Sequence, residues 1–310
     1  MNENEQLSKM ALALRAAYAR GENVMEFARC NFGEAANTPL ITLLAYDLQS
    51  GSYINGARAD PDYRIRWCGQ LAKLLDCYVS PEDSLLEVGC GEATTLAGVL
   101  NALHRPVRQA LGFDISWSRC AYATAWLREK GANAKLFVGD LFNIPLEDES
   151  VDVVYTSHSL EPNGGKEKEA IQELLRIARK AVVLIEPAFE FATEDARQRM
   201  ISHGYVRNLK GTAEKLGAQI VEHRMLEVYG NPLNPSGVLS LLKTTSSAAP
   251  STIRWRCPVT HVPMLPNSDA FVAEMAGLVY PVLGGIPLLR NDHAVVASAF
   301  SACAMARGEM

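Results

Sequence analysis

Two glycines follow a short apolar run in the stretch LLEVGCGEATTLA, residues 85–97. A side chain at Gly89 or Gly91 would obstruct a ligand that approaches the backbone closely, so this bend favours a nucleotide-type ligand. The dinucleotide fingerprint needs a third glycine three residues after the second, and Thr94 stands there instead. A phosphate-binding P-loop fails as well, because the Gly-Lys-Ser/Thr signature is missing. Alternatively, both glycines serve only a tight turn.

Two acidic residues follow the next two apolar runs. Asp114 comes at about the distance at which a βαβ unit places a carboxylate on a ribose diol. Asp140 could accept a hydrogen bond from an adenine amino group while the ring packs on Leu141. Two plainer interpretations stay open. Asp114 could cap a following helix, although Ser116 is better placed to do so, and Asp140 could be an exposed loop acid.

The elements that must position these residues follow from periodicity. From residue 81 onward, apolar runs alternate with helical patterns, which predicts a parallel α/β sheet with helices on both faces. Two later runs could form a hairpin-like pair at the sheet edge. The first 80 residues have mostly helical spacing, with breaks near 38–39 and 50–51. The expected strands are 84–88, 109–114, 134–138, 151–156, 181–186, 218–226 and 237–243, and the expected helices are 5–20, 64–78, 93–103, 117–130 and 166–180.

Taken in order, LLEVGCGEATTLA, ALGFDIS and FVGDLFNIPLEDESVDVVYT resemble class I S-adenosylmethionine-dependent methyltransferases over about residues 80–243. The resemblance implies a Rossmann-like seven-stranded sheet whose sixth and seventh strands are antiparallel, and S-adenosylmethionine as cofactor. One departure is Ala93, where the family often has glycine. The resemblance also implies a cofactor-binding set: Glu87, Gly89 and Gly91 around the methionine part, Asp114 on the ribose, Asp140 with Leu141 on the adenine, and Ile115 in the same set.

Methyl transfer from a sulfonium needs alignment of nucleophile, methyl and sulfur, and it needs a base only when the acceptor must lose a proton. The segment after the fourth expected strand should lie where the acceptor binds. His158 is the first candidate base because its ordinary pKa lies near neutrality, and Glu161 is the second. Asn163 could orient an acceptor. Alternatively, this segment only lines the cofactor pocket. Glu186 could bind a polar acceptor or cap a loop.

Two further segments could border the site. Tyr53, in the stretch YDLQSGSY, resembles the aromatic segment that many such enzymes fold over the cofactor, and its alternative role is packing beneath the N-terminal helices. Asn231 and Asn234 lie in a proline-rich loop and could contact the acceptor. We therefore expect three units: a helical lid region over 1–80, a methyltransferase domain over 81–245 and a smaller unit over 252–293.

Residues 244–251 are small and polar and are expected to be a linker. Beyond them, residues 253–293 resemble the small zinc-ribbon-like activators of methyltransferases, as a β-rich unit. A structural zinc site needs four ligands. Only Cys257 and His261, plus Cys303 beyond the resemblance, are available, so we expect no metal. This unit is interpreted either as a fused activator that covers apolar surface or as a structural appendage.

Composition limits the function further. The chain has 310 residues and a net charge of -5, so a general attraction to nucleic acid is not favoured, although a local basic patch stays open. Seven cysteines without a Cys-x-x-Cys pair indicate reduced thiols. No secretory signal or apolar run of about 18 residues is present, which predicts a cytoplasmic protein without a membrane span.

The expected function is methyl transfer to an oxygen or nitrogen of a small molecule or saccharide intermediate. Three alternatives compete with this function. RNA or protein could be the acceptor, or the chain could be a non-catalytic, cofactor-binding scaffold that activates a partner. An NAD-dependent oxidoreductase is the third, and the missing glycine at Thr94 argues against it. The sequence does not indicate an oligomeric state.

Overall fold

A central sheet organises the described residues of the computed structural model, which are 3–32, 38–243 and 252–307. Seven strands form it in the order β3-β2-β1-β4-β5-β7-β6. Strands β1 to β5 are parallel, whereas β7 is antiparallel to both β5 and β6, which confirms the closing pair expected at the edge. Their bounds are β1 Ser84–Val88, β2 Gln109–Asp114, β3 Lys135–Val138, β4 Val151–Ser157, β5 Ala178–Pro187, β6 Gln219–Met225 and β7 Ser236–Leu242.

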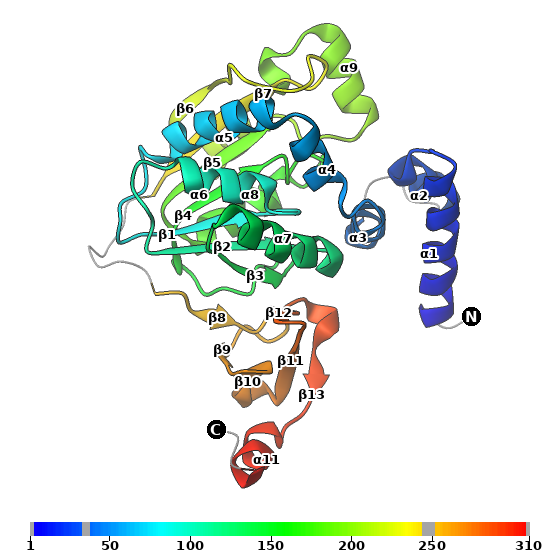
Figure 1. Cartoon of the computed structure of the whole chain (residues 1–310), viewed down its shortest axis with the longest axis vertical. Coiled ribbons are helices and arrows are strands. Elements are labelled where there is room, and N and C mark those ends of the chain that lie inside the picture. The colour runs from blue at the N-terminus through cyan, green and yellow to red at the C-terminus, as the bar shows by residue number, and fades with distance from the viewer. Residues whose placement is uncertain (1–2, 33–37, 244–251, 308–310) are drawn as a thin grey trace.

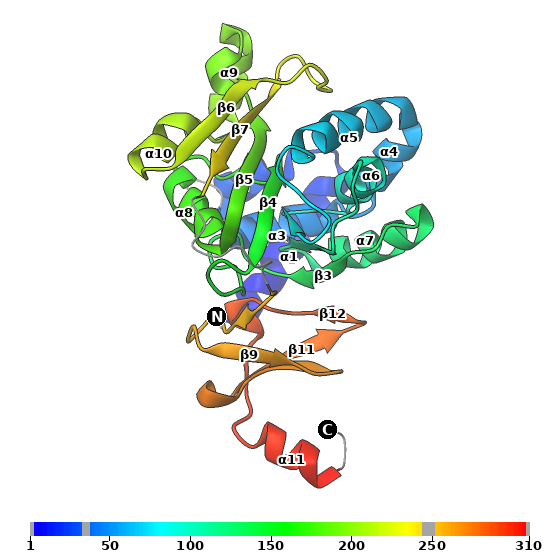
Figure 2. The ribbon, with the colours of Figure 1, turned by 90° about the vertical axis from the view of Figure 1, so that its left-hand side faces the viewer.

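Helices cover both faces of this sheet (Figure 2). On one face lie α5 (Pro61–Leu75), α6 (Thr94–Ala102) and α7 (Trp117–Lys130), whose apolar side chains pack on β1 and β4. On the other lie α8 (Glu167–Ile177) and α10 (Leu209–Lys215). Strand β1 is buried along its whole length, as a strand covered on both faces must be. The fold is therefore the expected α/β class.

The end of α8 differs from the expectation. The helical pattern was expected to reach residue 180, but β5 begins at Ala178. Arg179 explains the early start, because its buried guanidinium pairs with Asp152 of the neighbouring strand β4. The segment between β5 and β6, for which no element was expected, holds a short 3-10 turn η1 (Phe189–Phe191), the helix α9 (Glu194–Ser202) and α10.

The N-terminal region is helical, with α1 (Glu3–Ala19), α2 (Val24–Phe32), α3 (Pro39–Leu48) and α4 (Ser52–Ala59). Thr38 caps α3 by accepting a hydrogen bond from Ile41 N, and Gly51, with φ 95°, separates α3 from α4. Both breaks lie where they were expected. Helices α1 and α2 pack on α3 and stand away from the sheet, whereas α3 and α4 lie beside it (Figure 1). None of the described helices is long and apolar enough to cross a membrane.

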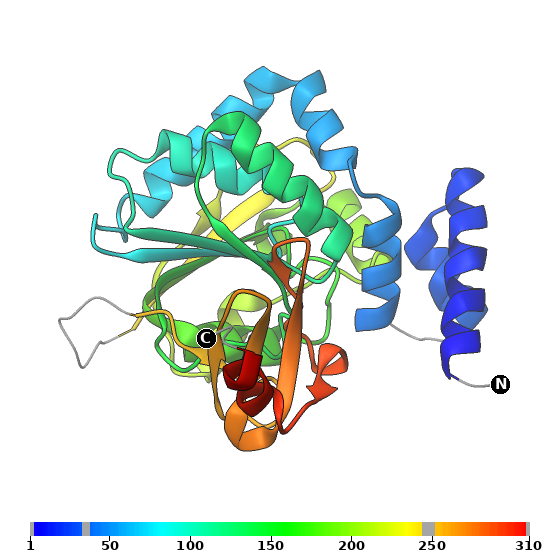
Figure 3. The ribbon, with the colours of Figure 1, turned by 60° about the horizontal axis from the view of Figure 1, so that its bottom comes forward.

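The C-terminal module, defined here as residues 252–296, is β-rich as expected. Its strands form a second sheet in the order β12-β11-β10-β9-β8, with β13 paired to β11. It lies below the central sheet (Figures 1 and 3), and a short helix, α11 (Phe300–Arg307), follows it. The expected linker at 244–251 lies outside the described residues. The bounds are β8 Trp255–Arg256, β9 Pro263–Pro266, β10 Ala270–Ala273, η2 Glu274–Ala276, β11 Leu278–Leu283, β12 Ile286–Pro287, η3 Asn291–His293 and β13 Val295–Val296.

Candidate functional site

A cavity of about 420 Å³ lies at the carboxyl ends of the parallel strands and reaches under α3 and α4. This is where open α/β sheets bind their ligands. The structure brings the expected cofactor-binding residues and the two candidate bases to this one cavity, although their roles in binding and catalysis stay predictions. The lining includes Tyr53, Glu87, Gly89, Gly91, Asp114, Ile115, Asp140, Leu141, His158 and Glu161.

The bend after β1 is shaped by its two glycines. Gly89 and Gly91 have φ of 63° and 54°, in the left-handed region that side chains rarely adopt. A Cβ at Gly89 would lie 2.4 Å from Ser159 Cβ, and one at Gly91 would lie 3.0 Å from the Tyr53 ring. Backbone conformation and neighbouring protein atoms therefore favour glycine at both positions, which agrees with the turn interpretation and leaves the approach of a ligand a prediction. Ala93 is also left-handed, with φ 54°.

Asp114 fixes this bend. Its Oδ2 accepts a hydrogen bond from Gly91 N and its Oδ1 accepts one from Ser116 N, each at 3.0 Å. Burial raises the pKa of Asp114 above its ordinary value. Ser116 is the N-cap of α7, since its hydroxyl accepts from Arg119 N at 3.1 Å. Asp114 is thus not the helix cap, and it can accept further hydrogen bonds from the cavity side.

Asp140 lies in a tight turn after β3. Its Oδ1 accepts from Phe142 N at 2.9 Å, and its carbonyl accepts from Asn143 N at 3.1 Å. Leu141 is half-buried and packs against the core of the sheet. Asp140 is itself only partly exposed, so the structure places it in an ordered turn at the cavity instead of a free loop.

Glu87, at the end of β1, is a buried carboxyl group in the cavity wall. Tyr155 donates its hydroxyl to Glu87 Oε2 at 2.9 Å, and burial raises the pKa of Glu87 to about 8. Arg64 of α5 also lines the cavity, and its Nη1 donates to Thr95 Oγ1 at 3.3 Å. The buried Nε of Arg64 has no partner among the described residues. Sequence patterns did not single out Arg64, because only the packing of α5 brings it here.

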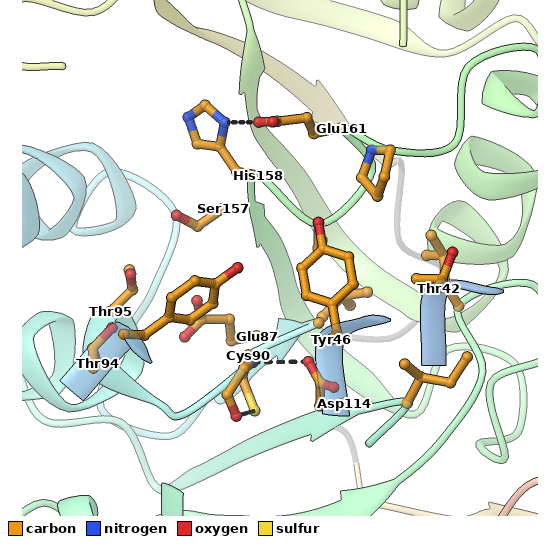
Figure 4. A pocket seen from close by; sticks show the side chains of 18 of the residues that line it. Thr42, Tyr46, Glu87, Cys90, Thr94, Thr95, Asp114, Ser157, His158 and Glu161 are labelled. Carbon is orange, nitrogen blue, oxygen red and sulfur yellow. Dashed lines mark hydrogen bonds and ion pairs between the residues drawn. The ribbon is translucent and has the colours of Figure 1, made fainter. Parts of the chain in front are cut away.

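At the opposite end of the cavity, His158 pairs with Glu161 (Figure 4). The pair is joined through His158 Nδ1, while His158 Nε2 lies 2.7 Å from Ser236 Oγ. Asn234 Nδ2 donates to Glu161 at 3.2 Å. Burial opposes both charges, but the attraction of the pair outweighs it, so the pKa of His158 lies above its ordinary value and that of Glu161 below. Sequence reasoning missed Ser236, the first residue of β7.

Glu186 caps the loop that carries this pair. Its carboxylate accepts from Ser159 N at 3.1 Å, from Leu160 N at 3.1 Å and from Glu161 N at 3.0 Å. Burial raises the pKa of Glu186 to about 7. His158 itself has φ 59°, a conformation that residues other than glycine hold only when their surroundings enforce it. Of the two roles weighed for Glu186, the structure therefore shows the loop cap.

Glu92 joins the α3–α4 cover to the bend after β1. Its fully buried carboxylate accepts from Gly51 N and Ile54 N, each at 2.8 Å, and pairs with Arg119 Nη1 at 3.2 Å. The guanidinium of Arg119 lies 4.2 Å from the ring centroid of Tyr53. Tyr53 thus lines the cavity from α4, as expected for a cover. Glu92 was missed, although an acid inside an otherwise apolar turn is a signal that could have found it.

Asn163, Asn231 and Asn234 all line the cavity, and their contacts with an acceptor stay predictions. In the described part of the chain, no group of three or more His, Cys, Asp or Glu side chains is placed to hold a metal ion. Cys257 instead accepts from Thr260 N at 3.4 Å and contacts the Tyr280 hydroxyl at 3.2 Å.

Comparison with known proteins gives a family for the core of the sheet. Residues 85–181 match the family described as methyltransferase domain. An uncharacterized 37.1 kDa protein in transposon TN4556 of Streptomyces fradiae is 28% identical over 131 residues, which cover 42% of this chain. The matched region spans only 37% of that relative's length.

Solved structures are similar to part of this chain. Magnesium protoporphyrin IX methyltransferase from Synechocystis PCC 6803, with bound S-adenosylmethionine, is 15% identical with a TM-score of 0.51, covering 68% of this chain and 100% of that one. Geranyl diphosphate C-methyltransferase from Streptomyces coelicolor is 11% identical with a TM-score of 0.45, covering 56% of this chain and 78% of that one. Residues 85–181 are therefore an enzyme domain, namely a methyltransferase domain, and the sheet around it has the Rossmann-like fold.

Proposed function

We propose that the whole chain transfers a methyl group from S-adenosylmethionine to an oxygen or nitrogen of a small molecule or saccharide intermediate. One observation carries the proposal. A single cavity holds two adenosine-type carboxylates, Asp114 and Asp140, at one end and the paired His158 and Glu161 at the other. Tyr46 projects from α3 between the two ends (Figure 4).

The residues present fit the cofactor. Asp114 has lone pairs left for a ribose diol, and Asp140 with Leu141 borders the space after β3. The unpartnered Nε of Arg64 suits the cofactor's carboxylate, and Glu87 suits its ammonium group. When bound, S-adenosylmethionine supplies an activated methyl group on a sulfonium. The protein then needs to hold the acceptor in line with that methyl group.

The paired residues supply a route for a proton. With Glu161 holding the Nδ1 proton of His158, the Nε2 lone pair faces Ser236 Oγ at 2.7 Å. When an acceptor must lose a proton as its new bond to the methyl carbon forms, Ser236 can take that proton and pass its own to His158. Glu161 then stabilises the imidazolium, as the carboxylate does in a Ser-His-acid triad.

The acceptor end of the cavity favours neutral or cationic molecules that donate hydrogen bonds. Glu161 keeps a lowered pKa and so stays ionised, and the buried Oδ1 of Asn234 has no partner among the described residues. Arg64 is the only lysine or arginine among the described residues that line the cavity, and it lies at the cofactor's methionine end. A phosphate-bearing acceptor such as RNA would find only the imidazolium of His158 as a counter-charge at this end, and Glu161 already pairs with it.

Two measurements test this function. Calorimetric titration of the full chain with S-adenosylhomocysteine should show binding at one site. Incubation of cell extract with radiolabelled S-adenosylmethionine and the protein should then place label in the low-mass fraction. Label that disappears after nuclease or protease treatment would instead identify RNA or protein as acceptor. Absence of both binding and labelling would refute the proposal.

A further inference from the structure

The central sheet lacks one helix of its cover. Between β3 and β4, residues 139–150 form turns and isolated bridges but no helix. The C-terminal module occupies that part of the face, next to β3 (Figure 3). Its Trp255 packs edge-on against Phe137 of β3, with ring centroids 5.2 Å apart, and against Phe271 at 4.9 Å. The module therefore covers apolar sheet surface that a crossover helix would otherwise cover.

The module also bonds to the end of β3, directly before the Asp140 turn. Leu288 forms a parallel bridge with Val138, and Leu289 N donates to Val138 O at 2.9 Å. Cys120, Val138 and Ile286 share a small buried cluster between α7, β3 and the module. The strand that delivers Asp140 to the cavity is thus held on one edge by β2 and on the other by the module.

Asn143 is the direct link between the turn and the module. Its backbone N–H donates to the Asp140 carbonyl at 3.1 Å and so closes the turn. Its side-chain Nδ2 donates across the interface to Pro258 O at 2.7 Å and to Asn291 Oδ1 at 2.9 Å. Both donors of one amide group are therefore used on the module, and a residue of the turn is fixed by a unit more than a hundred positions away.

The segment that follows Asp114 also forms a hydrogen bond with the module. Trp117, the first residue of α7, follows the Asp114–Ser116 segment, and its Nε1 donates to Leu283 O at 3.1 Å. A Cβ built on Gly284 would come within 3.5 Å of the Trp117 ring. The module thus contacts Trp117, three residues after Asp114 at the end of β2, and also the turn after β3 that holds Asp140.

We propose that the C-terminal module sets the adenosine subsite of the cofactor, with Asn143 as the positioning residue. The proposal rests on the proposed function and deepens it. Asn143 does not line the cavity, so its effect on the cofactor passes through the Asp140 turn. Loss of its side chain leaves the turn bonded to β3 but free to move relative to Asp114. The module therefore acts on cofactor affinity and not on the acceptor end.

The test compares two variants of the full chain at the same interface. Asn143→Ala removes the two side-chain bonds next to the Asp140 turn. Arg254→Ala is the matched control, because Arg254 also makes two side-chain bonds across the interface, to Glu147 and to Asp148 O, each at 2.7 Å but away from the cavity. Calorimetric titration uses S-adenosylhomocysteine and, separately, adenosine. Amide exchange of Phe142 and Asn143 reports on the turn.

For Asn143→Ala we expect both dissociation constants to rise by the same factor, roughly 2- to 10-fold, as for loss of a net hydrogen-bond contribution. Exchange at Phe142 and Asn143 should accelerate. Arg254→Ala should change neither the dissociation constants nor the exchange rates, even if it lowers the melting temperature as much as Asn143→Ala does. Equal affinities for Asn143→Ala and wild type, or equal losses in both variants, would overturn the inference. If the wild-type chain binds neither compound, the proposed function fails instead.

Discussion

His158 Nε2 and Ser236 Oγ lie 2.7 Å apart, although 78 positions separate these residues in the chain. The contact joins the loop after β4 to the first residue of β7. Because Glu161 occupies the other ring nitrogen, His158 has no free nitrogen to present to an acceptor. The hydroxyl of Ser236 is therefore the polar group through which His158 would act. Strand β5 lies between β4 and β7 in the sheet, so the order of the strands, and no local motif, creates this arrangement.

Replacement of His158 by Ala should lower methyl transfer by about 100-fold or more, the contribution of a general base. Affinity for S-adenosylhomocysteine should stay near that of wild type, because His158 lies at the far end of the cavity. Turnover of the wild type should rise with pH through the pKa of His158, which lies above its ordinary value, since only the neutral imidazole accepts a proton. Radiolabel transfer measured across pH checks this. Equal losses of turnover and affinity would make His158 a structural residue.

Asp114→Ala should weaken binding of S-adenosylhomocysteine by about 1–3 kcal/mol, the cost of leaving buried donors unpaired. The structure adds a second effect. Gly91 N and Ser116 N also lose their acceptor, so the melting temperature of the free protein should fall as well. Calorimetry and thermal unfolding measure the two effects. If Asp114→Ala lowers the melting temperature but leaves the affinity for S-adenosylhomocysteine unchanged, then Asp114 stabilises the bend after β1 and does not bind the cofactor.

Glu87 should couple cofactor binding to proton release. Its pKa of about 8 means that the free protein holds Glu87 largely protonated at neutral pH. A cationic ligand beside Glu87 stabilises the carboxylate, so binding should release up to about one proton and strengthen as pH rises toward 8. Calorimetric titrations at one pH, in buffers of different ionisation enthalpy, measure the number of protons released on binding. Glu87→Gln should abolish it, and release that persists in Glu87→Gln would assign the proton to another group.

The locations of the strands followed from their apolar runs, and 84–88 and 109–114 match β1 and β2 residue for residue. The candidate site residues could be predicted for a related reason. They follow directly on those strands, and parallel strands bring their carboxyl ends to one edge. Local sequence therefore carried the information for the glycine bend, Asp114 and Asp140.

Other parts of the site depend on contacts between distant segments. Arg64 and Ser236 reach the cavity from α5 and β7, and neither is marked by a motif. The Glu92–Arg119 pair becomes visible only when α4 packs on the bend. The end of α8 was misplaced because the apolar residues of 166–180 fit a helix as well as a strand. Pairing with Asp152, and not periodicity, decides that Arg179 is in β5.

Stability should fall as pH rises through neutrality because of Glu186. Its folded-state pKa of about 7 lies above the ordinary value, so the folded state binds more protons than the unfolded state between these two pH values. This contribution is fully present below pH 4.5 and is lost as pH rises through 7. The free energy of unfolding, measured by urea titration from pH 5 to 8, should drop more steeply for wild type than for Glu186→Gln. Parallel curves would contradict the assignment.

Gly89 offers a test of why the bend needs glycine. Gly89→Ala combines a left-handed φ of 63° with a Cβ placed 2.4 Å from Ser159 Cβ, so Ser159 and the His158 loop must shift. Gly165 is a matched control, because its φ is 88° and nothing lies within 4 Å of an added Cβ. Gly165→Ala should cost only the backbone penalty, about 1–2 kcal/mol. Gly89→Ala should cost more in urea unfolding and should also weaken S-adenosylhomocysteine binding. Equal costs, with binding intact, would show that the bend accommodates a side chain without moving Ser159.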